Sequence, residues 1–127
     1  MSRLDSFIRR LEAQRACLDL AFGKLVAGAI LELGLGNGRS FDHIRQHFGP
    51  ARTIYALDRQ LAAHPDCMPN ELLLGEFGDT LPALARRIGR SVALVHADTG
   101  SGDQAASRAA ARGLPALLEP LLVEGAL

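Results

Sequence analysis

Hydrophobic residues recur at helical spacing near the start of the chain. Leu4, Phe7, Ile8 and Leu11 stand at i, i+3, i+4 and i+7. This spacing predicts an amphipathic helix over residues 3–25. We expect its apolar stripe to pack on a sheet while its charged face meets solvent. A helix that lies on a membrane surface or against a partner is the alternative.

Short apolar runs alternate with helical segments over the rest of the chain. The runs predicted to be strands are residues 29–33, 53–58, 71–77 and 91–97. The predicted helices are residues 40–48, 80–88, capped by Thr80, and 103–112, capped by Asp103, with further helical turns from Pro115. Because parallel neighbours need a crossover, this alternation predicts the α/β class, a parallel sheet with helices on both faces.

Length, charge and cysteine usage exclude several classes of protein. The chain has 127 residues, enough for one domain, which we divide into an N-terminal helix (1–25) and an α/β core (29–127). Fourteen basic and fourteen acidic residues give no net charge, which disfavours a nucleic-acid-binding protein. Two distant cysteines predict neither a zinc site nor a disulfide. With no apolar run near ~20 residues and no signal peptide, we expect a cytoplasmic protein without a membrane partner.

A glycine-rich loop follows the first predicted strand and leads into the next helix. Its sequence is Gly34-Leu35-Gly36-Asn37-Gly38. Glycines permit backbone angles that a β-carbon forbids and let a ligand come close to the main chain. Asp58 ends the second predicted strand, where a carboxylate can accept hydrogen bonds from both hydroxyls of a ribose. These features favour an adenosine-containing cofactor.

Two positions narrow the identity of that cofactor. The dinucleotide fingerprint G-x-G-x-x-G would place its third glycine at position 39, where Arg39 stands. Glu32, two residues before the loop, suits a ligand with an ammonium group better than a pyrophosphate. No Gly-Lys-Ser/Thr follows at the spacing of a P-loop. An NAD-binding oxidoreductase domain is therefore a weaker alternative.

The stretch E-L-G-L-G-N-G, residues 32–38, resembles the first motif of class I S-adenosylmethionine-dependent methyltransferases. With LGNGRSFDH, IYALDR, HPDC, LLLGEF and VHADTGSGD, it is similar to a small bacterial subgroup of these enzymes over nearly the whole chain. The resemblance implies a Rossmann-like, doubly wound, mostly parallel sheet and S-adenosyl-L-methionine as cofactor. It also implies methyl transfer to an acceptor, expected to be a small molecule, that the sequence does not identify.

The resemblance further implies which residues contact the cofactor. Glu32 would lie near the amino group, Asp58 would hold the ribose hydroxyls, and Glu76 would accept from the adenine amine beside the apolar wall of Phe77. The expected cofactor-binding residues are Glu32, Gly34, Gly36, Asn37, Gly38, Asp58, Arg59, Gly75, Glu76 and Phe77. A solvated acid at the end of a strand is the alternative for Glu76.

The end of the fourth strand matches the position that faces the methyl group and the acceptor in this family. His96 and Asp98 project from one side of that strand because strand side chains alternate. One of them is the expected general base. A partly buried structural histidine and a turn-forming aspartate are the alternatives. Asp98-Thr99-Gly100-Ser101 replaces the N/D-P-P-Y/F tetrad of enzymes that methylate nucleobase amines, which disfavours a DNA acceptor.

The other histidines predict no metal site. His43 and His47 are four residues apart on a predicted helix, but no HExxH motif accompanies them, so we expect an exposed helical face. His64 belongs to the irregular crossover over residues 59–70.

The class I methyltransferase sheet has seven strands, whereas this sequence predicts four, with residues 125–127 as the beginning of a fifth. Roughly 30 to 50 further residues would complete such a domain. Either the sequence is a shortened form of such a domain, or another chain covers the free edge of the fourth strand. We expect a homodimer or higher oligomer, because an uncovered apolar edge invites self-association. A non-catalytic module that binds S-adenosylmethionine or a nucleotide stays open, because the acceptor site commonly uses the missing end.

Overall fold

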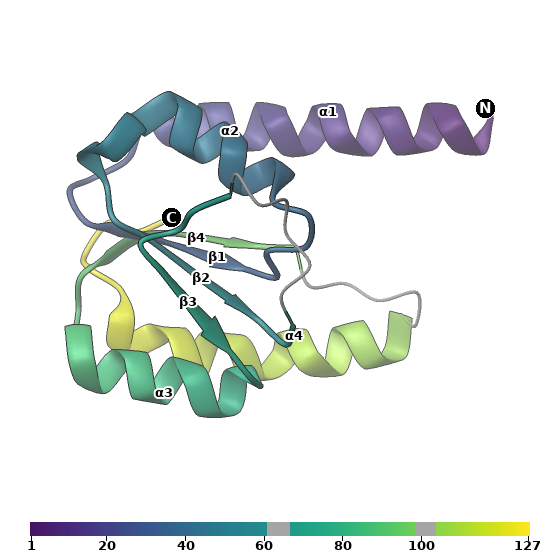
Figure 1. Ribbon diagram of the computed structural model, residues 1–127. Helices are drawn as coiled ribbons and strands as arrows, with labels where there is room; N and C mark the ends of the chain where they lie inside the picture. The colour runs from purple at the N-terminus through teal and green to yellow at the C-terminus, as the bar shows by residue number, and fades with distance from the viewer. Residues whose placement is uncertain (61–66, 99–103) are drawn as a thin grey trace.

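A four-stranded sheet forms the centre of the protein. The computed structural model describes residues 1–60, 67–98 and 104–127 (Figure 1). The sheet has the order β3-β2-β1-β4, and every pairing in it is parallel. The strands are β1 (Ala29–Leu33), β2 (Ile54–Asp58), β3 (Glu71–Leu74) and β4 (Val92–Ala97). The predicted α/β class is confirmed.

Helices cover both faces of this sheet (Figure 1). On one face lie α1 (Arg3–Phe22) and α2 (Arg39–Phe48), and on the other lie α3 (Phe77–Ile88) and α4 (Gln104–Leu118). Short 3-10 turns follow α2 and α4, at Gly49–Ala51 (η1) and Glu119–Leu121 (η2). Within the described residues, no helix has the length and apolar character needed to cross a bilayer.

Alternation along β1 divides the hydrophobic core into two layers. Ile30 is buried with residues of α1 and α2, whereas Leu31 and Leu33 are buried with residues of α3 and η2. Since strand side chains alternate, Glu32 points to the same side as Ile30. The acidic residue that precedes the glycine loop therefore faces α1 and α2.

The packing of α1 differs from the prediction. The helix begins with a capping box between Ser2 and Asp5 and ends at Gly23, before residue 25. Only its second half packs on the sheet, because the helix projects past the ends of the strands (Figure 1). The expectation that the whole apolar stripe is buried is wrong for its first half, where Leu4, Phe7 and Ile8 are 66%, 42% and 44% exposed.

Two element boundaries also differ from the prediction. The third strand ends at Leu74 rather than at residue 77, because Gly75 takes a φ of 140° and α3 begins at Phe77. Thr80 is not the cap of that helix; it lies inside the helix, where its hydroxyl donates to the carbonyl of Glu76. The last helix continues without a break through Gly113 and Pro115. Asp103, the rest of the 99–103 turn and His64 lie outside the described residues.

The C-terminal segment runs beside β4 as an irregular extension of the sheet. Leu122 forms a parallel bridge with Val92. Farther along, the Leu127 N–H donates to the Ala93 carbonyl and the Val95 N–H donates to the Leu127 carbonyl, both at 2.9 Å. Of residues 125–127, predicted to begin a fifth strand, only Leu127 bonds to β4, and the three residues form no regular strand. From Val92 to Val95 the edge of β4 is therefore occupied by the protein's own C-terminal segment.

Candidate functional site

The glycine loop turns the chain from β1 into α2 at the carboxyl edge of the sheet. Gly34, Gly36 and Gly38 take φ values of 77°, 55° and 88°. The loop is anchored by the Gly34 N–H, which donates to the Leu57 carbonyl at 2.8 Å. A β-carbon at Gly36 would meet no atom within 4 Å, so the backbone angle and not crowding requires glycine there. The space beside the loop is open to a ligand.

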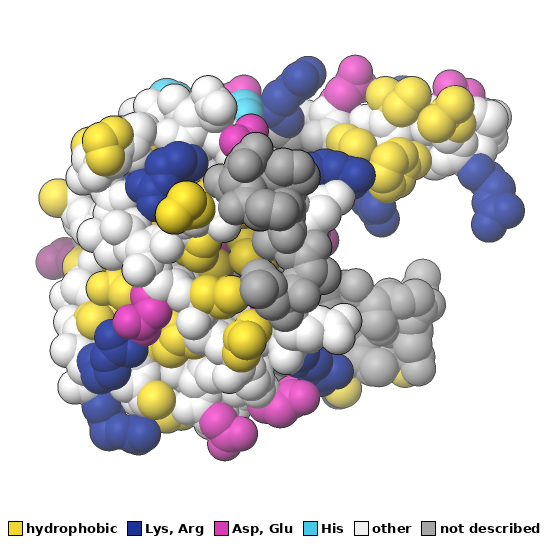
Figure 2. Space-filling view, in the orientation of Figure 1, with side chains coloured by type: hydrophobic (Ala, Val, Ile, Leu, Met, Phe, Trp, Pro, Cys, Tyr) yellow, Lys and Arg dark blue, Asp and Glu magenta, His cyan; other side chains and the backbone are white. Residues whose placement is uncertain are grey.

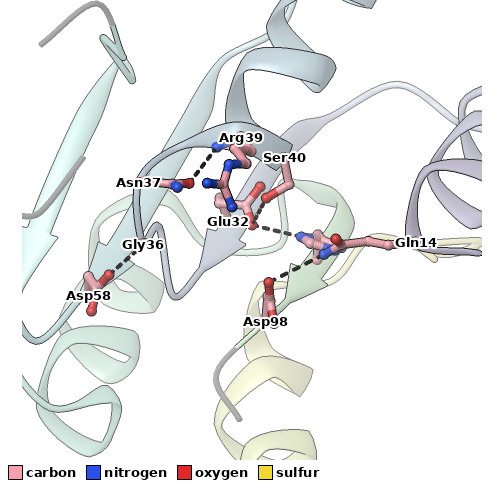
Figure 3. Close-up of polar contacts among 9 residues, drawn as sticks. Gln14, Glu32, Gly36, Asn37, Arg39, Ser40, Asp58 and Asp98 are labelled. Atoms are coloured by element: carbon pink, nitrogen blue, oxygen red, sulfur yellow. Dashed lines mark hydrogen bonds and ion pairs between the residues drawn. The ribbon is translucent and has the colours of Figure 1, made fainter. Parts of the chain in front are cut away.

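Asp58 ties this loop to the end of the neighbouring strand β2. One carboxylate oxygen, Oδ2, accepts from the Gly36 N–H at 3.0 Å (Figure 3), and the other, Oδ1, accepts from the Arg59 N–H at 2.7 Å. Asn37 accepts from the Arg39 N–H at 3.3 Å, at the start of α2. The predicted ribose-binding acid and the glycine loop are therefore in direct contact.

A buried acid–histidine pair lies at the ends of β1 and β4. Glu32 and His96 are register partners in these parallel strands, and Glu32 Oε1 lies 2.7 Å from His96 Nδ1. The Ser40 hydroxyl of α2 donates to the same oxygen at 3.2 Å. The Glu32 side chain is fully buried, yet its other oxygen, Oε2, has no hydrogen-bond partner. A buried carboxylate oxygen of this kind needs a donor from a ligand or a water.

The surroundings shift the proton equilibria of both members of the pair. Burial raises the pKa of the Glu32 carboxyl, because the charged form loses its hydration. The hydrogen bond to Glu32 raises the pKa of His96. Each shift favours the protonated form of its own group.

Gln14 of α1 completes this cluster and defines the state of the histidine ring. Its amide nitrogen lies 3.2 Å from His96 Nε2 and 3.4 Å from Asp98 Oδ2 (Figure 3). An amide N–H can only donate, so the His96 Nε2 atom accepts a hydrogen bond from Gln14. The ring proton is then on Nδ1, which donates a hydrogen bond to the Glu32 carboxylate. His96 and Asp98 thus lie on one side of the strand, as the alternation predicts. The exposed Asp98 and the partly buried His96 share one neutral donor.

The three residues predicted to face adenine follow directly after β3. Glu76 precedes α3, and its carboxylate pairs with Arg59 at 3.1 Å, with both side chains more than half exposed. Phe77 packs against the core on the α3 side. Gly75 stays close to Asp58, whose carbonyl accepts from the Gly75 N–H at 2.9 Å. Gly75 therefore contacts the last residue of β2, and Glu76 contacts the residue that follows it.

Helices α1 and α2 enclose a groove of about 420 Å³ beside the acid–histidine pair. Its residues are Ile8, Leu11, Glu12, Gln14, Arg15, Leu18, Arg39, Ser40 and His43. His43 is held by Asp19 of α1 at 2.6 Å, and His47 stacks on Phe22, so these two histidines join the helices. Among the described residues, no group of three or more potential metal-binding side chains comes together.

The sequence did not lead us to predict the contacts of Gln14 with His96 and Asp98, or the hydrogen bond from Ser40 to Glu32. The signal was present in the helical spacing: positions 14 and 15 lie between Leu11 and Leu18 on the predicted stripe, but they carry Gln14 and Arg15. Polar residues on the inner face of a helix mark a polar contact below it. Here that contact is the pair at the ends of β1 and β4.

A glycine loop between β1 and α2, with an acid at the end of β2, defines an α/β domain that binds an adenosyl cofactor. Residues 1–127 match the family model of S-adenosyl-L-methionine methyltransferases, and the chain belongs to this family. It is therefore a methyltransferase that uses S-adenosyl-L-methionine as its cofactor.

A solved structure agrees with this assignment. The sequence of this chain is 44% identical to that of an S-adenosyl-L-methionine methyl transferase from Silicibacter pomeroyi DSS-3. The crystal structure of that protein superposes on this chain with a TM-score of 0.89. The match covers 99% of this chain and 79% of the other. No curated protein matches the chain.

Proposed function

We propose that this methyltransferase acts on a small-molecule acceptor and that His96 is its general base, held by Glu32. The observation that carries this proposal is the buried contact of 2.7 Å between Glu32 and His96 Nδ1. Because Nδ1 donates to the carboxylate, Nε2 is the basic nitrogen. Glu32 is a positioning residue in this account, since it fixes the ring and its tautomer.

The described residues fit an adenosyl cofactor that bears an amino-acid end. The unpartnered Glu32 Oε2 suits the ammonium group, directly or through a water, once the site opens to it. Gly34, Gly36 and Gly38, with Asn37, would lie under the methionine and ribose portions. Asp58 would accept hydrogen bonds from the ribose hydroxyls. Each of its carboxylate oxygens already accepts one hydrogen bond from a backbone N–H and keeps a lone pair for a second.

The adenine end would be held by Gly75, Glu76 and Phe77, with Arg59 beside them. The ion pair between Arg59 and Glu76 supports this part of the proposal by placing both side chains at the ends of β2 and β3. For Phe77 to form the apolar wall, its ring would have to leave part of its present packing against the core layer on the α3 side of the sheet.

The bound cofactor supplies an electrophilic methyl group on sulfur. The chain itself has two tasks: to align the acceptor with that group and to remove a proton where the acceptor carries an O–H or N–H. His96 Nε2 removes the proton from the acceptor. It can do so once the Gln14 amide moves away, or once the acceptor replaces Gln14 as the hydrogen-bond donor to Nε2. Asp98, bonded to the same amide, is placed to orient Gln14.

His96→Gln tests the proposal, with Asp98→Asn as the matched control at the same strand end. Methyl transfer is measured as S-adenosylhomocysteine release over a panel of small acids, alcohols, amines and thiols. We expect His96→Gln to lower turnover by about 10²- to 10⁴-fold while calorimetry shows unchanged binding of S-adenosylhomocysteine. A larger loss in Asp98→Asn than in His96→Gln would make Asp98 the base. Binding without turnover across the panel would support the non-catalytic alternative.

We also propose a cytoplasmic bacterial protein that forms a homodimer and does not bind nucleic acid. Two observations support a cytoplasmic bacterial protein: the similar crystal structure is of a bacterial protein, and the thiol of Cys17 is free and exposed. The absence of net charge supports the proposal that the protein does not bind nucleic acid. The exposed apolar residues of α1 support the dimer (Figure 2). Sedimentation at tens of micromolar tests the last point, and a monomer alone contradicts it.

A further inference from the structure

We propose that Arg15 and Arg39, on the two walls of the α1–α2 groove, bind the carboxylate of the methionine part of S-adenosylmethionine. This inference rests on the proposed function, since it completes the same cofactor site. It makes the N-terminal helix, which the glycine motif does not include, a part of that site.

The groove adjoins the place proposed for the ammonium group. Ser40 lines the groove and also donates to Glu32, whose Oε2 is the orphan oxygen. The ammonium and the carboxylate of an amino acid are attached to one carbon atom. If the ammonium is received at Glu32, the carboxylate on the same carbon can reach the groove end of α2, where Arg39 precedes Ser40 (Figure 3).

Within the residues that the structure describes, the two arginines that line the groove have guanidinium groups without a protein partner. Five arginines elsewhere are engaged with carboxylates or carbonyl oxygens; these are Arg45, Arg52, Arg59, Arg87 and Arg90. Arg3 and Arg86 have no such partner among the described residues either, but they lie outside the groove. Within the described part of the chain, no ion pair or side-chain hydrogen bond engages the guanidinium of Arg15 or Arg39. Glu12, on the same face of α1, forms no ion pair with either. A guanidinium fork without a protein partner, beside a ligand site, suits a carboxylate.

The rest of the groove strengthens such a contact. Ile8, Leu11 and Leu18 line it beside the two arginines. Leu18 is only 5% exposed, so water is excluded beside it, and a charge pair gains strength where the effective dielectric constant is lower. The other ionisable group on the α2 wall, His43, is already bonded to Asp19.

Two nucleosides that differ at the amino-acid end provide the test. S-adenosylhomocysteine carries the carboxylate, whereas 5′-methylthioadenosine lacks the whole amino-acid end. Calorimetric titrations of both compounds are made with the wild type, Arg15→Gln, Arg39→Gln and the double variant. Arg10→Gln is the matched control, because it removes the same charge from an exposed position of α1 outside the groove. Thermal unfolding confirms that each variant is folded.

We expect the double variant to bind S-adenosylhomocysteine about 10- to 100-fold more weakly. Its affinity for 5′-methylthioadenosine should stay within about 2-fold of the wild type, and Arg10→Gln should change neither. Equal losses for both compounds, or no loss for S-adenosylhomocysteine, overturn the inference and leave the proposed function intact. A wild type that binds neither compound contradicts the proposed function itself.

Discussion

Two acidic side chains lie at the carboxyl ends of neighbouring strands of one sheet, one at the last residue and one at the last but one, yet their surroundings are opposite. Glu32 of β1 is fully buried and bonded to side chains, His96 and Ser40. Asp58 of β2 is partly exposed and bonded to backbone N–H groups of Gly36 and Arg59. The difference teaches that a shared position at the carboxyl edge does not imply shared surroundings: Glu32 organises a buried cluster of side chains, while Asp58 holds the backbone of the glycine loop.

The largest expected effect is on stability, from Glu32→Ala. The change removes a fully buried side chain and leaves His96 Nδ1 and the Ser40 hydroxyl without their acceptor. We expect the free energy of unfolding to fall by about 2–4 kcal/mol, against about 1 kcal/mol for Asp58→Ala, whose backbone donors can reach water. Urea denaturation measures both, with Glu124→Ala as an exposed control. Equal losses at the two positions would contradict the comparison.

Asp58→Ala should show its main effect on ligand affinity. Loss of the carboxylate that receives the ribose hydroxyls should weaken S-adenosylhomocysteine binding by about 1–3 kcal/mol. Calorimetry measures this change, and Asp58→Asn, which keeps one acceptor oxygen, should lose less. Unchanged affinity in Asp58→Ala would remove this residue from the site.

The Glu32–His96 pair should make stability depend on pH. The pKa of His96 is raised by Glu32 in the folded protein, so its stabilising contribution is complete below the unfolded value of about 6.5 and is lost as pH rises through the higher folded value. The raised pKa of Glu32 acts in the same direction at lower pH, because folding favours its protonated form. Urea midpoints at a series of pH values should fall above neutrality in the wild type. A curve as steep in His96→Gln would show that another group is responsible.

The smallest expected effect comes from Gln14→Ala. Its two contacts with His96 and Asp98 are neutral or long, so their loss should cost roughly 0.5–1.5 kcal/mol of stability. The informative readout is the pH profile of methyl transfer, because Gln14 keeps Nε2 as the accepting nitrogen. The profile should shift in Gln14→Ala and stay unchanged in Gln46→Ala, an exposed residue of α2. Identical profiles would remove Gln14 from the positioning role.

Much of the fold could be predicted from local patterns. The strands at Glu32 and Asp58 follow from apolar runs closed by glycines or an acid, and their parallel pairing follows from the helices between them. The end of the third strand could not be predicted, because Phe77 follows the apolar run closely enough to read as part of it, while the Gly75 backbone angle and the start of α3 depend on tertiary packing. The exposure of Leu4 and Phe7 also depends on how far the sheet extends below α1.

Contacts within the candidate site could be predicted only between residues that are close together in the sequence. Gly34, Gly36, Gly38 and Asp58 lie in or near one βαβ unit, so spacing alone brings them together. The contact of Gln14 with His96 joins positions 82 residues apart and depends on the way α1 crosses the sheet. The hydrophobic periodicity of α1 predicts a helix but not the direction in which the helix crosses the sheet.

A crystal structure of the protein with S-adenosylhomocysteine tests the central account most directly. We expect the nucleoside across the ends of β1 and β2, with its ribose hydroxyls about 2.7–3.2 Å from the Asp58 oxygens and its amino group directed to Glu32. Electron density for the ligand at any other place, with the glycine loop and Asp58 making no contact to it, would contradict the account.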